Sequence, residues 1–154
     1  MNIRKPILIA TIGVAAAAVF GVTAFASLGG GFTPGPQVRG TIGAVHLNAD
    51  RIKFQLKDDT DVVAQTITYA PGGFSGWHTH PGFVLVVVES GAMTIQVGCS
   101  ISTHPAGTAF EESGTTPIMA RNLGTVPAIL HVTYVVPKSA PARREVALAD
   151  APAC

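Results

Sequence analysis

From residue 37 onward, glycine and proline divide the chain into segments too short for ordinary helices, and this feature most limits its fold. These two residue types interrupt the chain about every ten positions, at the spacing typical of strands and turns. The intervening segments are rich in valine, isoleucine and threonine, and none has a convincing helical period. The pattern predicts an antiparallel all-β sandwich or barrel rather than a fold of alternating strands and helices.

The strands that we expect all lie between residues 38 and 136. They are 38–47, 51–56, 61–69, 83–89, 92–97, 106–111, 117–122 and 126–136. A chain of 154 residues suffices for one ordinary domain with one core. We expect the barrel to span residues 37–137, with a flexible Gly/Pro/Ser-rich linker at 27–36 before it and an extended, proline-rich tail at 138–154 after it.

The N-terminus carries one long apolar segment. Arg4 and Lys5 precede an apolar stretch at residues 7–25, which ends in Ala24-Phe25-Ala26. This order predicts a secretory signal peptide at 1–26, cleaved after Ala26. An uncleaved membrane-anchor helix is the alternative, because the stretch approaches the roughly 20 residues that span a bilayer. Both interpretations place the body of the protein outside the cytoplasm and allow membrane contact only through this segment.

Charge and cysteine content narrow the partners and the compartment. Charged residues make up 12% of the chain and the formal net charge is +1, which gives no support to nucleic acid as a partner. The two cysteines are Cys99 and Cys154. In an exported protein they allow one intramolecular disulfide, and closing its loop of about 55 residues would contribute about 4 kcal/mol. Two free thiols and an intermolecular bridge are the alternatives.

The candidate functional site is a pair of histidines, His78 and His80, separated by one residue. On a strand, alternate side chains point to the same face, so the two imidazoles would stand side by side with Cβ atoms about 7 Å apart. That separation allows both to bind one metal ion, and imidazole is a good ligand for zinc, iron, copper or nickel. Two imidazoles alone make an incomplete site.

The glycines around this pair extend the pattern. Gly72 is followed by five residues, His78-Thr79-His80, three residues, Val84, six residues and Gly91. This run resembles the first motif of the cupin superfamily, Gly-x5-His-x-His-x3-Glu-x6-Gly, with Val84 in place of the glutamate. Residues 107–114 and Asn122 resemble parts of the second motif, whose histidine falls at Ile118. The resemblance covers residues 61–137 and implies a jelly-roll β-barrel that follows the N-terminal signal or anchor helix.

The resemblance also implies a metal site with ligands missing. Cupins that hold a metal use the two histidines and the glutamate of the first motif and the histidine of the second, so here only His78 and His80 remain. His131, on a late strand, is the candidate to replace the missing histidine, and Glu111 or Glu112 to replace the missing glutamate. His104 is expected in a loop. The cofactor is then one divalent transition metal ion (zinc, iron, manganese, nickel or copper) or none.

Three functions follow from this sequence. The first is an exported cupin that binds a small, largely apolar molecule in a pocket lined by Trp77, Val84 and Ile118, with a reduced or absent metal site. The second is a metal-dependent oxygenase or isomerase that uses a non-standard third ligand. The third is a partner-binding module at the cell envelope, and the resemblance adds a homodimer as a further expectation.

Overall fold

The structure is a computed structural model that describes residues 26–154, so the predicted signal peptide or anchor lies outside the described residues except for Ala26. Within this range the only helix is the 3-10 turn η1 (Leu148–Asp150), and no described helix has the length and apolarity to cross a membrane. The strands are β1 (Gly30–Pro34), β2 (Val38–Ile42), β3 (Val45–Ala49), β4 (Ile52–Leu56), β5 (Thr60–Phe74), β6 (His78–Thr79), β7 (Phe83–Ser90), β8 (Ala92–Val97), β9 (Ser100–Pro105), β10 (Ala109–Ser113), β11 (Ile118–Arg121), β12 (Ala128–Pro137) and β13 (Arg144–Glu145).

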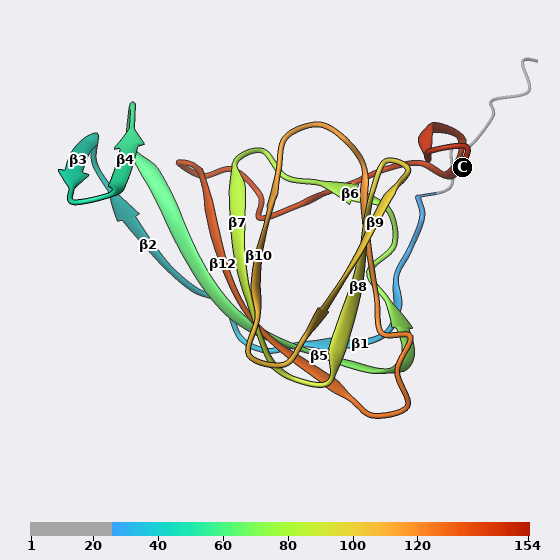
Figure 1. The fold of residues 1–154 in the computed structure, drawn as a ribbon. Helices are drawn as coiled ribbons and strands as arrows, with labels where there is room; N and C mark the ends of the chain where they lie inside the picture. Colours follow the sequence, from blue (N-terminus) through green and yellow to red (C-terminus); the bar gives the residue numbers. More distant parts are fainter. Residues whose placement is uncertain (1–25) are drawn as a thin grey trace, which may run out of the picture.

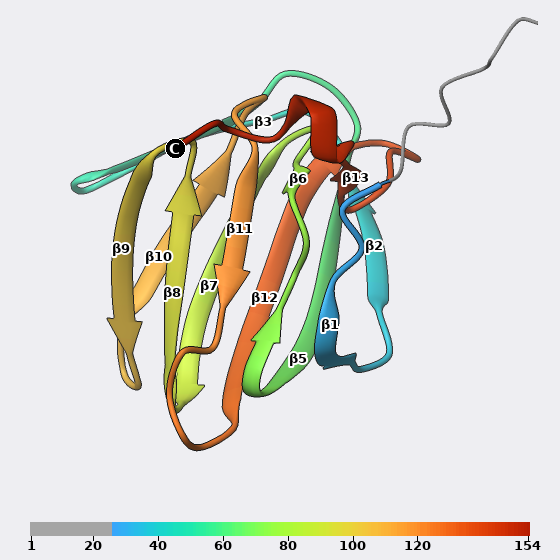
Figure 2. The ribbon, with the colours of Figure 1, turned by 90° about the vertical axis from the view of Figure 1, so that its right-hand side faces the viewer.

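The strands form a nearly closed antiparallel β-barrel (Figure 1). Around the barrel their order is β9-β8-β11-β5-β12-β7-β10, so β9 and β10 are the two edges that flank the remaining seam. Figure 2 shows the opposite wall, where β12 and β5 run side by side over ten paired residues. The all-β fold with almost no helix, predicted from the sequence, is confirmed and fits a cupin jelly roll.

The core of the barrel follows from the alternation of each strand. On β7, residues 84, 86 and 88 are buried while 85 and 87 are exposed, and β12 alternates in the same way from residue 128 to 134. Valine and isoleucine at the inward positions suit a pleated surface that packs on one face. The buried cluster consists of Val63, Ile67, Tyr69, Val84, Val86, Val88, Met93, Ile95, Ile118, Ala120, Ala128, Leu130, Val132, Tyr134, Val136 and Ala142.

The region expected to be a linker is part of the sheet. Residues 30–34 form β1, which pairs with the second half of β5, and the Ser27 hydroxyl accepts a hydrogen bond from the Trp77 amide (2.9 Å). The prediction of a flexible linker at 27–36 is therefore wrong. Its glycines were interpreted as flexibility, but Gly29 lies where a Cβ would be 2.5 Å from the carbonyl oxygen of Ser75. Glycine here permits close packing of two backbones.

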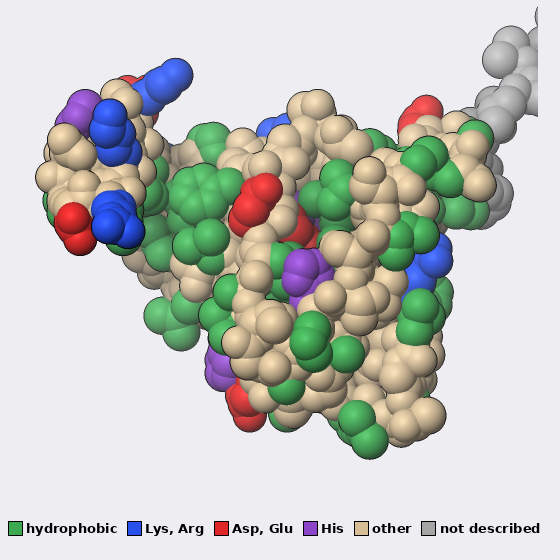
Figure 3. Space-filling view, in the orientation of Figure 1, with side chains coloured by type: hydrophobic (Ala, Val, Ile, Leu, Met, Phe, Trp, Pro, Cys, Tyr) green, Lys and Arg blue, Asp and Glu red, His purple; other side chains and the backbone are tan. Residues whose placement is uncertain are grey.

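The predicted strand at 38–47 divides into β2, which pairs with β5, and β3, which pairs only with β4. The β3–β4 hairpin projects from the barrel as an arm (Figure 1). In its register Val45, Leu47 and Ala49 lie opposite Leu56, Phe54 and Ile52, so one face of the arm is apolar. Basic side chains lie on the arm together with histidine and acidic side chains (Figure 3). The homodimer expected from the sequence stays a prediction.

The C-terminal segment, expected to be an extended tail, returns to the barrel. Its strand β13 pairs with β6, which carries the first histidine of the motif, and Ala26 forms an isolated bridge with Ala147. The predicted disulfide is present: Cys99 and Cys154 are bonded, with Cα atoms 5.6 Å apart. Residues 138–154 are therefore part of the folded body, held at one end by β13 and at the other by the disulfide.

Candidate metal centre

The two histidines lie where a short strand enters a tight loop. Both imidazoles are buried, at 4% exposure each, and their ring centres are 4.9 Å apart. Pro81 and Gly82 follow them, and a Cβ on Gly82 would lie 1.9 Å from the backbone oxygen of Val135. Glycine is needed at this position because the loop backbone passes directly against β12. This close packing fixes the place of His80 at the end of the barrel.

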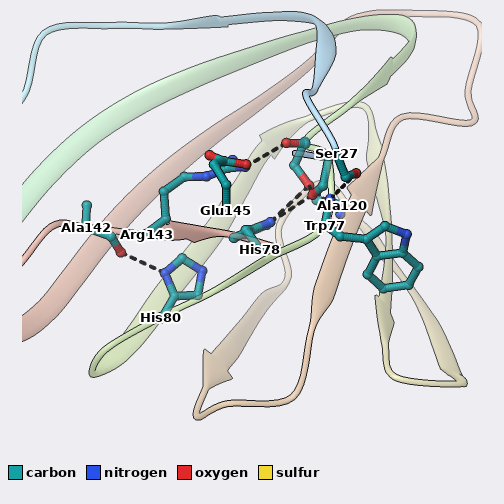
Figure 4. A network of polar contacts seen from close by, with 10 residues as sticks. Ser27, Trp77, His78, His80, Ala120, Ala142, Arg143 and Glu145 are labelled. Atoms are coloured by element: carbon teal, nitrogen blue, oxygen red, sulfur yellow. Dashed lines mark hydrogen bonds and ion pairs between the residues drawn. The ribbon is translucent and has the colours of Figure 1, made fainter. Parts of the chain in front are cut away.

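Backbone carbonyls orient both imidazoles. The Nδ1 of His80 donates to the carbonyl of Ala142 (2.8 Å), and the Nδ1 of His78 donates to the carbonyl of Gly76 (3.0 Å), as Figure 4 shows. A carbonyl can only accept, so the proton of each neutral ring is on Nδ1. Both Nε2 atoms therefore keep a free lone pair. This is the usual outer-shell arrangement for histidines that bind metals, because it fixes ring orientation and tautomer together.

A buried carboxylate completes the group. Glu112 lies on β10, and its Oε2 is 3.2 Å from the Nε2 of His80. One donor atom from each of His78, His80 and Glu112 lies within 4.8 Å of the others, and all three residues are buried. Ligands about 2.1 Å from a tetrahedral metal ion are about 3.4 Å apart, so only small side-chain adjustments are needed to enclose an ion. These three residues could therefore hold a metal ion.

The register of the sheet explains why this glutamate is the one that points inward. Glu112 pairs directly with Val84 across β10 and β7, and both side chains are buried. Val84 occupies the place of the glutamate in the first motif, so the carboxylate stands one strand away from the expected position. Directly opposed residues have Cβ atoms about 5 Å apart, a distance that a glutamate side chain can cover.

The cavity beside these ligands is small and mostly apolar. Its volume is about 30 Å³, room for a metal ion with a very small additional ligand. Eight hydrophobic or aromatic residues form most of the wall, and Arg143 adds one cation. The full lining is Ile67, Tyr69, His78, His80, Val86, Phe110, Glu112, Ala120, Leu130, Val132, Tyr134 and Arg143.

Burial and charge shift the protonation equilibria around this cavity. Burial, together with the nearby Arg143 cation, lowers the pKa of His78 to about 4, so its ring is neutral at pH 7. Burial, together with the Glu112 carboxylate, raises the pKa of Tyr134 to about 12. A neutral imidazole with a free Nε2 is the form that binds metals, so His78 is ready to bind without losing a proton.

The other predicted ligands lie elsewhere. His131 points out of the barrel, half exposed, and its Nε2 contacts the Glu89 carboxylate, so the prediction of His131 as third ligand is wrong. It occupies an outward position of β12, between buried Leu130 and Val132. Glu111 is also wrong as third ligand, because it is exposed on the outward face of β10. Glu112, the other candidate carboxylate, shares the inward face with Phe110, and this two-residue period in the sequence could have distinguished the two glutamates.

The predicted pocket residues are buried but do not line this cavity. Val84 and Ile118 are fully buried members of the barrel core. Ile118 pairs with His78 in the sheet and occupies the place of the family's second-motif histidine. The Trp77 ring points away from the two imidazoles (Figure 4) and is 7% exposed. The prediction that these three form the ligand pocket is therefore not supported, because Tyr69, Phe110, Leu130 and Tyr134 form its wall instead.

Two further structural features were not found from the sequence. Arg143 and Ala142 come from the segment expected to be a free tail, and both contact the site. His104, expected in a loop, lies on β9, and its ring stacks on Phe110 of β10 with ring centres 4.4 Å apart. This contact bridges the seam of the barrel, on the face where Figure 3 shows histidine and acidic side chains grouped over β9 and β10.

No protein-family model and no curated protein matches this chain. Similar solved structures include the Cupin_2 domain of an XRE family transcriptional regulator from Enterobacter cloacae (23% identity, 49% of this chain and 81% of that one, TM-score 0.44). Another is the cupin domain of Cnp3 from Schizosaccharomyces pombe (11% identity, 58% of this chain and 61% of that one, TM-score 0.45). The resemblance to cupins thus rests on the motif residues and on the nearly closed all-β barrel.

Two other solved structures match a similar share of the chain. One is an oxalate oxidase (22% identity, 47% of this chain, TM-score 0.42), of which the chain spans only 40%. The other is the TT1209 protein from Thermus thermophilus (25% identity, 49% of this chain and 72% of that one, TM-score 0.44). Alignments of this extent give no information on the activity, ligand or metal of the present cupin-like barrel.

Proposed function

We propose that this protein binds one divalent transition metal ion inside its barrel through His78, His80 and Glu112. One observation carries the proposal: the Nε2 of His80, whose Nδ1 holds the ring proton, faces a carboxylate oxygen of Glu112 at 3.2 Å in a buried setting. Two lone pairs at this distance repel unless a positive charge lies between them. A metal ion between them would supply that charge, with the Nε2 of His78 as third ligand.

The donor set limits the metal. Two imidazole nitrogens and one carboxylate oxygen suit zinc, iron(II), nickel or copper, whereas calcium and magnesium prefer oxygen ligands only. Three protein ligands leave at least one coordination position open, which is typical of catalytic rather than purely structural sites. This open position supports the alternative of a metal-dependent enzyme.

The size of the cavity favours a very small ligand over a drug-sized apolar molecule. Pockets for drug-sized molecules measure about 300–1,000 Å³, and this cavity measures about 30 Å³. The largely apolar small molecule expected from the sequence is therefore not supported as the ligand in this structure. The cavity size favours a substrate or metal ligand of only a few heavy atoms.

The disulfide bears on where the protein acts. The Cys99–Cys154 disulfide is of a kind that persists in oxidising surroundings, which indicates a non-cytoplasmic location. With the apolar segment at residues 7–25, this favours export of the protein. We therefore place the metal-binding barrel outside the cytoplasm.

Calorimetric titration of the purified, metal-free protein with Zn(II) and Co(II) tests the proposal, because both ions accept this donor set. We expect one ion per chain. Glu112→Gln should weaken binding by at least about 100-fold, since it removes the anionic ligand and keeps the side-chain volume. Glu111→Gln is the matched control, because Glu111 lies next in sequence on the exposed face. Equal affinity of the two variants, or no binding by the wild type, would contradict the proposal.

A further inference from the structure

The C-terminal segment brings a cation to the metal cavity. Arg143 lines the cavity, and its position is set by three interactions of its own segment. Its Nη2 donates to the carbonyl of Ser75 (2.8 Å) and to the carboxylate of Glu145 (2.7 Å), and the next residues pair with β6. Figure 4 shows the side chain running past the two imidazoles toward Glu145. Its guanidinium therefore has a fixed place beside the proposed metal.

One donor of this guanidinium has no acceptor. The Nε of Arg143 is buried and is the only buried side-chain nitrogen or oxygen among the described residues without a hydrogen-bond partner. Buried donors in native proteins are almost always satisfied by protein, ordered water or a bound ion. An arginine N–H is a charged donor, and its preferred partner is an anionic oxygen. Because Arg143 lines the cavity, this Nε is a donor that a ligand of the cavity could satisfy.

The charges around the cavity favour an anion as that acceptor. A divalent metal would contribute +2, Arg143 contributes +1 and Glu112 contributes −1. Glu145 offsets part of the guanidinium charge from the solvent side, with 42% of its side chain exposed. A positive charge thus remains in a mostly apolar cavity, where electrostatic interactions are strong.

We propose that the cavity binds a small monovalent anion that contacts the metal ion and the Arg143 guanidinium together. The inference rests on the proposed metal site, whose open coordination position receives one end of the anion. The small size of the cavity, about 30 Å³, favours a ligand of very few heavy atoms, such as formate. The ligand class is thus a small carboxylate or an inorganic anion of similar size.

The test uses the Co(II)-loaded protein, whose visible absorption changes when a ligand of the metal changes. Formate is the probe, and formamide is its neutral counterpart with the same number of heavy atoms. We expect formate to shift the spectrum saturably and formamide to have no effect at the same concentration. Arg143→Gln should weaken formate binding by about tenfold or more, because it removes a charge-assisted contact. Arg144→Gln, which changes the exposed neighbouring arginine, should bind formate like the wild type.

The affinity for Co(II), measured by calorimetry without formate, separates this inference from the proposed function. Arg143→Gln should still bind one Co(II) per chain, which also shows that the variant is folded. Normal Co(II) binding with equal formate affinity in the wild type and Arg143→Gln would overturn the anion site alone, as would an equal effect of formamide. Absence of Co(II) binding by the wild type would overturn both proposals.

Discussion

At the scale of single residues, the site depends on which side chain brings the carboxylate. Glu112 and Val84 are directly paired and both point into the barrel, so either position can present a carboxylate to His80. The chain places the acid on β10 and a valine on β7. The spacing of the first motif revealed the loss at residue 84, but it contained no information about a replacement 28 residues later.

This pairing predicts a functional exchange between the two positions. Glu112→Gln alone should lose most of the affinity for Zn(II) or Co(II). Adding Val84→Glu should restore at least part of it, because a glutamate at 84 starts about 5 Å from the original one on the same face. Calorimetry of the single and double variants checks the prediction. A double variant no better than Glu112→Gln would show that only β10 can supply this ligand.

His78 predicts a pH dependence of stability in the metal-free protein. Its pKa is lowered to about 4 in the folded state and is near 6.5 when unfolded, so the unfolded chain binds the proton more tightly. The stability due to the neutral ring is complete above pH 6.5 and is lost as the pH falls towards 4. From pH 7 to 5 the wild type should lose about 2 kcal/mol more than His78→Gln, measured by urea unfolding. Equal losses in both proteins would contradict the prediction.

At the scale of elements, the C-terminal segment helps to build the site, and little in the sequence indicated this. Its Ala142 carbonyl orients His80, its Arg143 lines the cavity and β13 pairs with β6. Proline and alanine in this segment predicted an extended tail. The few residues that contact the site form no sequence pattern that would predict this contact. The disulfide was predicted correctly, since two cysteines allow one intramolecular pair, but its consequence for the metal site came from the packing.

The disulfide therefore predicts an effect on both stability and metal affinity. Cys154→Ser removes a cross-link over a separation of 55 residues. Loop entropy gives an upper estimate of about 4 kcal/mol for the loss of stability. Zn(II) affinity should fall by about tenfold as β13 separates more readily from β6, because outer-shell contacts of this kind contribute 10- to 100-fold. Denaturant unfolding and calorimetry, with Ser100→Ala as an exposed control, measure both effects; unchanged metal affinity would argue against this role of the tail.

The loop after the histidines gives a second prediction at this scale. Gly82→Ala would place a Cβ 1.9 Å from the Val135 oxygen, a contact with rigid backbone on β12. We expect a loss of about 2 kcal/mol or more and weaker metal binding, because the loop that carries His80 must move. Gly107→Ala offers a contrast: its φ of +81° is unfavourable for alanine, but no atom lies within 4 Å of the added Cβ. If Gly82→Ala binds metal normally, this loop does not position His80.

At the scale of the whole molecule, the site joins distant elements of the chain into one body. Ligands come from β6, the following loop and β10, orientation comes from residue 142, and the wall comes from β5, β7, β11 and β12. Metal binding should therefore stabilise the whole barrel. Zn(II) at a free concentration of 100 times its Kd adds about 2.7 kcal/mol if only the folded state binds it. The melting temperature should rise by on the order of 10 °C in calorimetric scans, and Glu112→Gln should show little of this rise.

The sequence by itself determined the class of the fold, most of the strands, the histidine pair and the disulfide, because these depend on local patterns. Alternation, turn residues and motif spacing act within about ten residues. The sequence did not predict β1 or β9. For β1, glycine in the expected linker reflected close backbone packing. For β9, the polar Ser100-Ile101-Ser102-Thr103 run lacks a buried face.

The third ligand, the Arg143 cation and the size of the cavity were decided only by the tertiary structure. Glu111 and Glu112 have the same chemistry, and the register of β10 against β7 buries one and exposes the other. His131 faces outward because β12 presents Leu130 and Val132 to the core. Which distant side chains meet at His80 depends on barrel closure and on the return of the tail. These are long-range contacts, and no local pattern specifies them.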